Sequence, residues 1–290
     1  MLNNREIKVL HIEPTDVCQA ACPLCARETD PAFDKKSQHH LTTNQILEIF
    51  SESEIAKLDK MFMCGNYGDP AAGKHTLEIY KLFRKINPNI TLGMNTNGGI
   101  QSTAWWRELG QLFNNINDYV VFSIDGDSQT NHIYRKNVVW NQVINNVQSF
   151  INAGGRAHWD MLVYQHNQHQ VDECEQLAKD MGFTWFRAKV SKRQLVNNLK
   201  YPIGWERPDV KHGPIDCFVL KEKSIYIDAQ GRVSPCCWLG STQSTPVSSL
   251  EDVRKTWDTN TPNSVCAATC SKNLSGTNFT NQWQRAIALC

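Results

Sequence analysis

Short apolar runs alternate with longer amphipathic segments over the first two thirds of the chain. The short runs, rich in β-branched and aromatic residues, predict six strands at residues 8–12, 60–64, 90–95, 119–124, 158–164 and 184–189. The longer segments carry apolar residues at helical spacing and predict helices at residues 43–50, 77–86, 103–113, 139–153 and 171–181. Strands joined by crossover helices form parallel sheets, so the pattern indicates an α/β protein whose ligand lies at the carboxyl ends of its strands.

A second unit is predicted after residues 200–213, a stretch rich in Pro, Gly and charged residues. Two short strands at residues 224–227 and 232–234 flank the turn sequence Asp228-Ala229-Gln230-Gly231. Turn residues between two apolar runs predict a β-hairpin.

Three cysteines, Cys18, Cys22 and Cys25, lie directly after the first predicted strand. Their spacings of three and two intervening residues allow the thiols to reach one metal centre from a single loop. Structural zinc takes four protein ligands, whereas a [4Fe-4S] cluster held by three cysteines leaves one iron open to another ligand. The alternative interpretations are a zinc knuckle and a buried thiol cluster.

Composition and charge narrow the function classes. The chain has 290 residues and a formal net charge of +1, so no broad field attracts nucleic acid or an anionic membrane. Its apolar runs are far shorter than a membrane span, and the first residues lack a targeting segment. Eleven cysteines without a secretory signal favour metal binding in a reducing compartment over a disulfide scaffold. We therefore expect a cytoplasmic protein.

Polar, glycine-bearing segments follow three of the predicted strands, where ligands of α/β proteins bind. They read Cys64-Gly65-Asn66-Tyr67-Gly68-Asp69-Pro70 after the second strand, Asn95-Thr96-Asn97-Gly98-Gly99 at the end of the third, and Ser123-Ile124-Asp125-Gly126 at the end of the fourth. Glycines let the backbone approach a ligand, and Asp69 supplies an acceptor. A simple turn at Gly68-Asp69-Pro70 and a capping role for Asp125 are the alternatives.

In this context the cysteine loop resembles that of the radical S-adenosylmethionine (SAM) enzymes, whose Cys-x3-Cys-x2-Cys signature directly follows the first strand of a partial barrel. The resemblance implies a partial (β/α)6 TIM-type barrel over residues 1–205. It implies that Cys18, Cys22 and Cys25 hold a [4Fe-4S] cluster whose open iron is chelated by SAM. The reduced cluster would then cleave SAM to methionine and a 5'-deoxyadenosyl radical.

The same resemblance implies a set of SAM contacts. Residues 65–70 are similar to the Gly-Gly-Glu-type motif that holds the SAM amino group, with the shorter Asp69 in place of the commoner Glu. An Arg at the position of Arg135 commonly pairs with the SAM carboxylate, a task that suits the bidentate guanidinium. The expected SAM-binding residues are Gly65, Gly68, Asp69, Asn95, Ser123, Asp125 and Arg135.

The second unit resembles an auxiliary-cluster extension. The spacing of Cys217, Gly231 and Cys236 is similar to the start of the type called SPASM, but only Cys266 and Cys270 follow, so the shorter Twitch type with one cluster fits residues 206–290 better. The expected ligands of this second [4Fe-4S] cluster are Cys217, Cys236, Cys266 and Cys270. Cys236 is preferred over Cys237 because adjacent residues at a strand end point to opposite faces.

The remaining cysteines Cys64, Cys174 and Cys290 are interpreted as buried small hydrophobes without a role. The resemblance implies an enzyme that takes an electron from a donor such as flavodoxin or ferredoxin and abstracts hydrogen from a peptide or small polar molecule. Because the chain begins almost at its first strand, a ribosomal peptide is the less expected substrate. The alternative function is a two-cluster electron carrier, in which Asp69, Ser123 and Arg135 would have no task.

Overall fold

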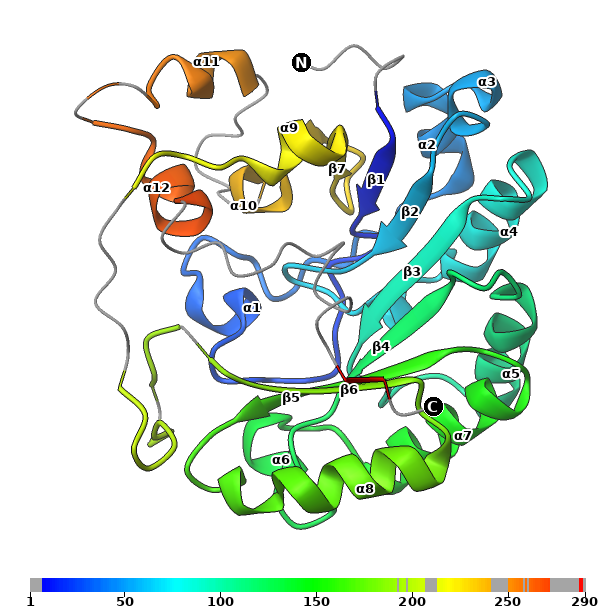
Figure 1. Ribbon diagram of the computed structural model, residues 1–290. Coiled ribbons are helices and arrows are strands. Elements are labelled where there is room, and N and C mark those ends of the chain that lie inside the picture. The colour runs from blue at the N-terminus through cyan, green and yellow to red at the C-terminus, as the bar shows by residue number, and fades with distance from the viewer. Residues whose placement is uncertain are drawn as a thin grey trace.

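The computed structural model describes residues 7–191, 193–196, 198–206, 213–240, 250–257, 259, 261–271 and 287–288. Its strands form one sheet in the order β8-β7-β1-β2-β3-β4-β5-β6-β9 (Figure 1). The six central strands are parallel neighbours: β1 (Val9–Ile12), β2 (Lys60–Met63), β3 (Thr91–Thr96), β4 (Tyr119–Ser123), β5 (Ala157–Val163) and β6 (Trp185–Val190). The predicted α/β class and the six parallel strands are confirmed.

Five long helices lie on the outer side of the curved sheet, as Figure 1 shows. They are α2 (Thr43–Ile49), α4 (Thr76–Ile86), α5 (Thr103–Leu112), α7 (Trp140–Asn152) and α8 (Val171–Met181). Each end of these five helices lies within one residue of the predicted end. The agreement follows because each helix carries an apolar stripe and several have capping residues in the sequence. The start of α2, for example, has a capping box in which Thr42 and Gln45 bond each other's backbone N–H groups.

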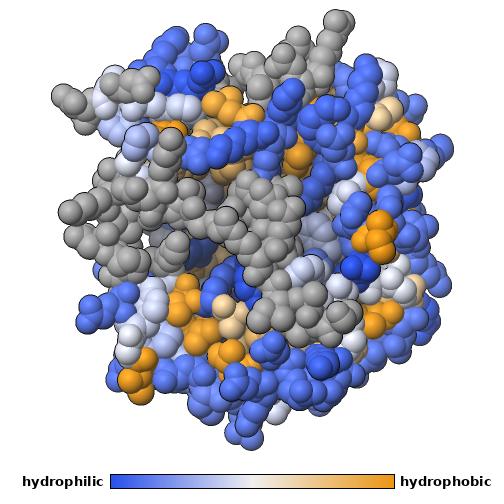
Figure 2. All heavy atoms as spheres, in the orientation of Figure 1, coloured by the Kyte–Doolittle hydropathy of each residue, from blue (hydrophilic) through white to orange (hydrophobic). Residues whose placement is uncertain are grey.

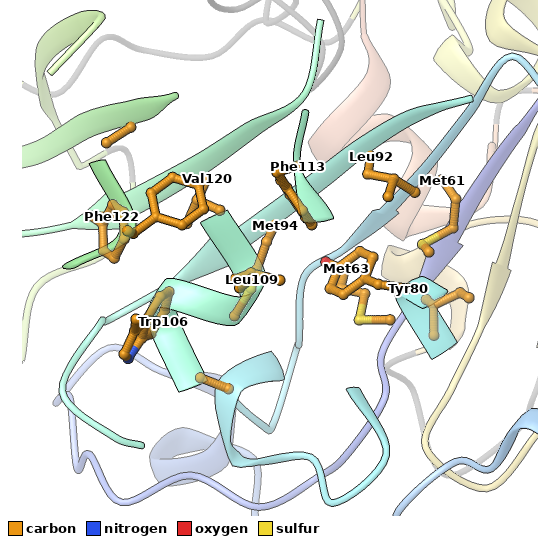
Figure 3. Packing of buried hydrophobic residues seen from close by; sticks show 14 of the residues in the cluster. Met61, Met63, Tyr80, Leu92, Met94, Trp106, Leu109, Phe113, Val120 and Phe122 are labelled. Carbon is orange, nitrogen blue, oxygen red and sulfur yellow. The ribbon is translucent and has the colours of Figure 1, made fainter. Parts of the chain in front are cut away.

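The main core lies between this outer face of the sheet and the helices (Figure 3). Alternate strand residues such as Met61, Met63, Leu92, Met94, Val120 and Phe122 meet helix residues such as Tyr80, Trp106 and Leu109. Successive strand side chains point to opposite faces, so the residues between these line the inner side of the barrel. There Tyr119, Val121 and Trp185 form a small separate apolar cluster.

Short helical turns join the strands and long helices. They are α1 (Ala26–Thr29), α3 (Glu52–Ile55), η2 (Pro70–Ala72), α6 (Asn131–Tyr134) and η3 (Gln168–Gln170). Three of them, α1, η2 and α6, follow the carboxyl ends of β1, β2 and β4, where the candidate chemistry lies.

The later part of the chain contributes α9 (Phe218–Glu222), β7 (Ser224–Ile227), β8 (Val233–Ser234), α10 (Cys237–Gly240), α11 (Leu250–Arg254), α12 (Ser264–Cys270) and β9 (Ile287–Ala288). The predicted hairpin is present, since β7 and β8 pair antiparallel. It does not form a sheet of its own: β7 pairs parallel with β1, and β9 pairs antiparallel with β6. The boundary at residue 205 stays a prediction, and Cys290 lies outside the described residues.

Hydrophilic side chains cover most of the described part of the face seen in Figure 2, with apolar side chains in scattered patches. Among the described helices, we find none with the length and apolar character needed to cross a membrane.

Candidate active site

The cysteine loop lies at the carboxyl edge of the sheet, where it meets segments from three neighbouring strand ends. Asn97 Nδ2 donates to Cys18 Sγ (3.7 Å), and Arg135 Nη1 donates to Cys22 Sγ (3.9 Å). Cys25 Sγ in turn donates to the carbonyl of Asn66 (3.8 Å). The loop is therefore surrounded by residues that follow β2, β3 and β4, as expected for a ligand site of an α/β protein.

The three thiols are close enough to interact electrostatically; Cys22 is buried, and Cys18 and Cys25 are half-buried. Burial raises the pKa of the Cys22 thiol, and the Arg135 guanidinium opposes this shift. Burial also raises the pKa of Cys18 and of Cys25, so thiolates here need nearby positive charge such as that of bound iron.

The donor set of this loop fits a [4Fe-4S] cluster. Such a cluster takes each thiolate on a different iron, and three cysteines on one loop can supply three of these ligands. The N–H donors of Asn97 and Arg135 add the hydrogen bonds to sulfur that commonly accompany such clusters.

Gly65 and Gly68 allow the loop after β2 to fold tightly and to approach the segment that leads into the cysteine loop. A Cβ atom at Gly65 would lie 2.0 Å from the carbonyl oxygen of Gly68, and one at Gly68 would lie 1.9 Å from that of Thr15. Both distances are far inside van der Waals contact, so a larger residue at Gly65 would distort the loop after β2, and one at Gly68 would push that loop away from Thr15. The glycines predicted from the sequence are thus required by backbone packing.

Asp69 joins the loop after β2 to the end of β3. Its Oδ1 accepts hydrogen bonds from Ala71 N (2.9 Å) and Thr96 Oγ1 (2.7 Å). Its Oδ2 accepts from Asn97 N and Asn97 Nδ2, both at 2.7 Å. Protein donors therefore use all four acceptor positions of this buried carboxylate. A contact from Asp69 to an ammonium group of SAM would require one of these bonds to break.

Asp125 and Arg135 form a buried ion pair beside Cys22. Arg135 Nε donates to Asp125 Oδ2 at 2.7 Å, with side-chain exposures of 15% and 0%. The other oxygen, Asp125 Oδ1, accepts from Leu162 N at 2.6 Å. Burial raises the pKa of Asp125, and the Arg135 guanidinium opposes that shift. Asp125 is more than a cap, because it holds the guanidinium next to the cysteine loop.

Asn95 and Ser123 lie on the inner side of the barrel at the ends of β3 and β4. Asn95 Oδ1 is buried without a hydrogen-bond partner in the part of the chain that is described. A buried acceptor without a protein partner is the kind of group that a bound ligand satisfies. Ser123 is half-buried and is paired in register with Asp160 of β5.

Glu13, which was not predicted from the sequence, connects two segments at the same edge through its carboxylate. Its Oε1 accepts from Tyr67 N (2.7 Å) and Gly68 N (3.0 Å), and its Oε2 accepts from the hydroxyl of Tyr226. Asn66 Nδ2 also reaches the carbonyl of Cys237 at 2.9 Å. The sequence signal was the position of Glu13 directly after β1, but its partner Tyr226 is more than 200 residues away in the sequence.

Tyr226→Phe is expected to lower the free energy of unfolding by about 1.5 to 3 kcal/mol, because it removes a hydrogen bond to a buried carboxylate. Urea unfolding of the apo chain measures this change. Tyr201→Phe is the matched control, since it removes an exposed bond to a backbone carbonyl and should cost less. Equal losses in the two variants would show that Glu13 does not depend on Tyr226.

A second group of cysteines lies in the later part of the chain. Cys217 precedes α9, Cys236 precedes α10, and Cys266 and Cys270 occupy one face of α12. Burial and the proximity of Cys270 and Cys217 raise the pKa of Cys236 to about 12. Cys236 also packs with Leu239, Val253 and Cys266.

Cys237 has different surroundings from Cys236. It is buried, and burial, Cys236, Cys64 and Glu13 all raise the pKa of its thiol, so it faces groups on the side of the main site. Cys236 is thus the member of this adjacent pair that accompanies Cys217, Cys266 and Cys270. Of the remaining cysteines, Cys64 is half-buried and Cys174 is fully buried.

The sequence matches the radical SAM superfamily over residues 12–181. This match covers more than half of the 290 residues, so the chain belongs to the radical SAM superfamily. The family implies an enzyme with a [4Fe-4S] cluster and SAM as cofactors. A search of curated proteins finds no significant match.

Solved structures with a similar fold include two proteins bound to S-adenosylmethionine. Streptococcus suis SuiB bound to S-adenosylmethionine superimposes with a TM-score of 0.59 at 12% identity, over 88% of this chain and 66% of SuiB. The tagged anSMEcpe structure with bound AdoMet gives a TM-score of 0.57 at 16% identity, over 96% of this chain and 79% of that chain. A second SuiB structure is bound to the precursor peptide SuiA, and the present chain covers 65% of the SuiB chain in it. At these identities the likeness shows the fold.

Proposed function

We propose that this protein cleaves SAM reductively and abstracts hydrogen from a substrate held inside the partial barrel. The observation that carries the proposal is the cysteine loop, whose thiols meet Asn97 and Arg135 at the carboxyl edge of the sheet. A two-cluster electron carrier would need the thiols, but it would not need the buried Asp125–Arg135 pair beside them.

The cluster and SAM supply the reductive cleavage and the 5'-deoxyadenosyl radical when they are bound. The residues of the chain bind and orient them. Cys18, Cys22 and Cys25 would hold the cluster, and Arg135 would bind the SAM carboxylate while Asp125 keeps its guanidinium in place. Gly65, Gly68 and Asp69 would shape the loop that receives the amino group, with Asn95 and Ser123 lining the SAM site from the inner side. These assignments are supported by the contacts and burial described above.

We further propose that Cys217, Cys236, Cys266 and Cys270 bind an auxiliary [4Fe-4S] cluster in a Twitch-type unit spanning residues 206–290. Their mutual proximity supports this assignment. With four thiolate ligands such a cluster has no open iron, so it would not bind SAM. It would accept an electron from the product or anchor part of the substrate.

The substrate is proposed to be a peptide or a small polar metabolite, and the electron donor a small protein such as flavodoxin or ferredoxin. The structures of SuiB with its precursor peptide and of anSMEcpe with bound peptides support the peptide class. The expectation of a cytoplasmic location stays a prediction from cysteine use.

The central test is anaerobic reconstitution with iron and sulfide, followed by SAM titration and reduction with a chemical reductant. We expect about eight irons per chain, from two clusters of four, and formation of 5'-deoxyadenosine. SAM binding measured by calorimetry separates this proposal from the electron carrier, which would bind the clusters but not SAM.

Cys237→Ala is expected to keep both clusters, whereas Cys236→Ala should lose or degrade the second cluster and leave the first able to bind SAM. The reason is that Cys236, and not its neighbour, lies beside the other three thiols. Iron content and the electron paramagnetic resonance spectrum of each variant measure the outcome. Loss of the second cluster in Cys237→Ala, with its retention in Cys236→Ala, would contradict the ligand assignment.

A further inference from the structure

The inner side of the barrel carries a group of three charged residues that the proposed SAM site does not use. Asp160 lies on β5, and Arg187 and Lys189 lie on β6. Arg187 Nε and Nη2 approach Asp160 Oδ1 at 2.7 Å, and Lys189 Nζ donates to Asp160 Oδ2 at 2.7 Å. Register pairs Arg187 directly with Asp160, so the three side chains share the face opposite the helices.

This group has one more positive than negative charge. Two cations share the single carboxylate of Asp160. Burial alone would raise the pKa of Asp160, but Lys189 and Arg187 hold it below its usual value, so the carboxylate is ionised. Asp125 is the next nearby carboxylate, and its charge is already balanced by Arg135. Lys189 therefore shares its carboxylate with a second cation.

Lys189 is the member that can meet a ligand. Its side chain keeps 41% of its surface exposed, against 16% for Arg187 and 11% for Asp160. An ammonium group has three N–H donors, and the described contacts of Lys189 use one of them, toward Asp160. Partial removal from water lowers the pKa of Lys189, which is the cost that a bound anion would offset.

The position of this group points toward substrate rather than toward folding alone. Asp160 is in register with Ser123, two residues before Asp125, so the group continues the wall that carries the proposed SAM site. On the other side of it, toward the start of the strands, Tyr119, Val121 and Trp185 form the small apolar cluster of the inner face. A ligand on this wall would therefore meet one cationic group next to an apolar surface.

We propose that Lys189 binds an anionic group of the substrate, a carboxylate or a phosphate, while Asp160, itself bonded by Arg187, orients its ammonium group. This inference rests on the proposed function, because it assumes that the substrate enters the barrel. It narrows the substrate to molecules that carry such a group within reach of the β6 wall.

The test measures protection of Lys189 from an amine-reactive reagent on the anaerobically reconstituted protein, with peptide mass spectrometry as the readout. Labelling rates are compared in sodium acetate, sodium phosphate and sodium chloride at equal ionic strength. We expect acetate or phosphate to slow the labelling of Lys189 about threefold at twice its dissociation constant. Lys179, on the exposed side of α8, is the internal control and should label equally in all three salts.

The comparison of the three salts distinguishes a carboxylate from a phosphate. Protection by acetate alone indicates a carboxylate, and protection by phosphate alone indicates a phosphate. Equal labelling of Lys189 in all three salts would overturn the proposal. Protection by added SAM but by neither salt would also overturn it, because the anion would then be the carboxylate of SAM. The labelling does not require SAM cleavage. This proposal can therefore fail while SAM cleavage is observed, and SAM cleavage can be absent while an anion still protects Lys189.

Asp160→Asn tests independently whether the negative charge of Asp160 competes with a bound anion for Lys189. The substitution keeps the side-chain shape but removes the carboxylate that competes for the Lys189 ammonium group. Protection by the effective salt should therefore be stronger than in the unmodified chain at the same concentration. Unchanged or weaker protection in a variant that still reconstitutes its iron would contradict competition between Asp160 and the bound anion for Lys189.

Discussion

Replacement of Cys18, Cys22 and Cys25 together by alanine is expected to abolish SAM cleavage and to remove about half of the iron. Cys64 also lies at this edge, but the three thiols of the loop are the ones that meet Asn97, Arg135 and the carbonyl of Asn66, so their replacement removes the ligands of the first cluster. Iron per chain and 5'-deoxyadenosine formed after chemical reduction measure the two effects. The remaining iron should belong to the second cluster and should not respond to SAM.

Cys174→Ala is the matched control for this prediction. Cys174 is fully buried on α8 and lies among apolar residues of the main core. Its replacement should leave iron content and SAM cleavage unchanged. Cleavage by the triple variant, or reconstitution with zinc and no iron, would contradict the proposed function.

Arg135→Ala is expected to lower the free energy of unfolding by about 3 to 5 kcal/mol. The change leaves the carboxylate of Asp125, which has no exposed side-chain surface, without its charged partner. Urea unfolding of the apo chain measures this loss. Arg232→Ala is the matched control, because it breaks an ion pair with Asp228 in which the arginine is 43% exposed. An exposed pair of this kind contributes about 1 kcal/mol or less.

A double variant separates the structural task of Arg135 from its proposed contact with SAM. Asp125→Asn combined with Arg135→Ala removes the unpaired charge, and the asparagine oxygen can still accept from Leu162 N. Stability should then recover in large part. SAM affinity should stay weaker by about 1.5 to 3 kcal/mol, roughly tenfold or more, because the charge-assisted bond to its carboxylate is still missing. Recovery of SAM affinity together with stability would show that Arg135 only supports the fold.

The sequence alone was sufficient for the secondary structure of the barrel and for the cysteine loop. Apolar periodicity is a local property, so the six strands and five long helices could be located without knowing their neighbours. The order of the motifs along the chain likewise placed Cys18, Asp69 and Arg135 after β1, β2 and β4, at one edge of the sheet, because the carboxyl ends of parallel strands share that edge.

Only the tertiary structure decided which polar groups meet at that edge. It showed that the protein itself uses all four acceptor positions of Asp69, that Asp125 holds Arg135, and that Glu13 bonds Tyr226. It also added β7 to the edge of β1, where the sequence predicted a separate small unit. Some of these pairings join residues more than 200 positions apart, and they depend on strand register and distance, which the local pattern of apolar and polar residues does not contain.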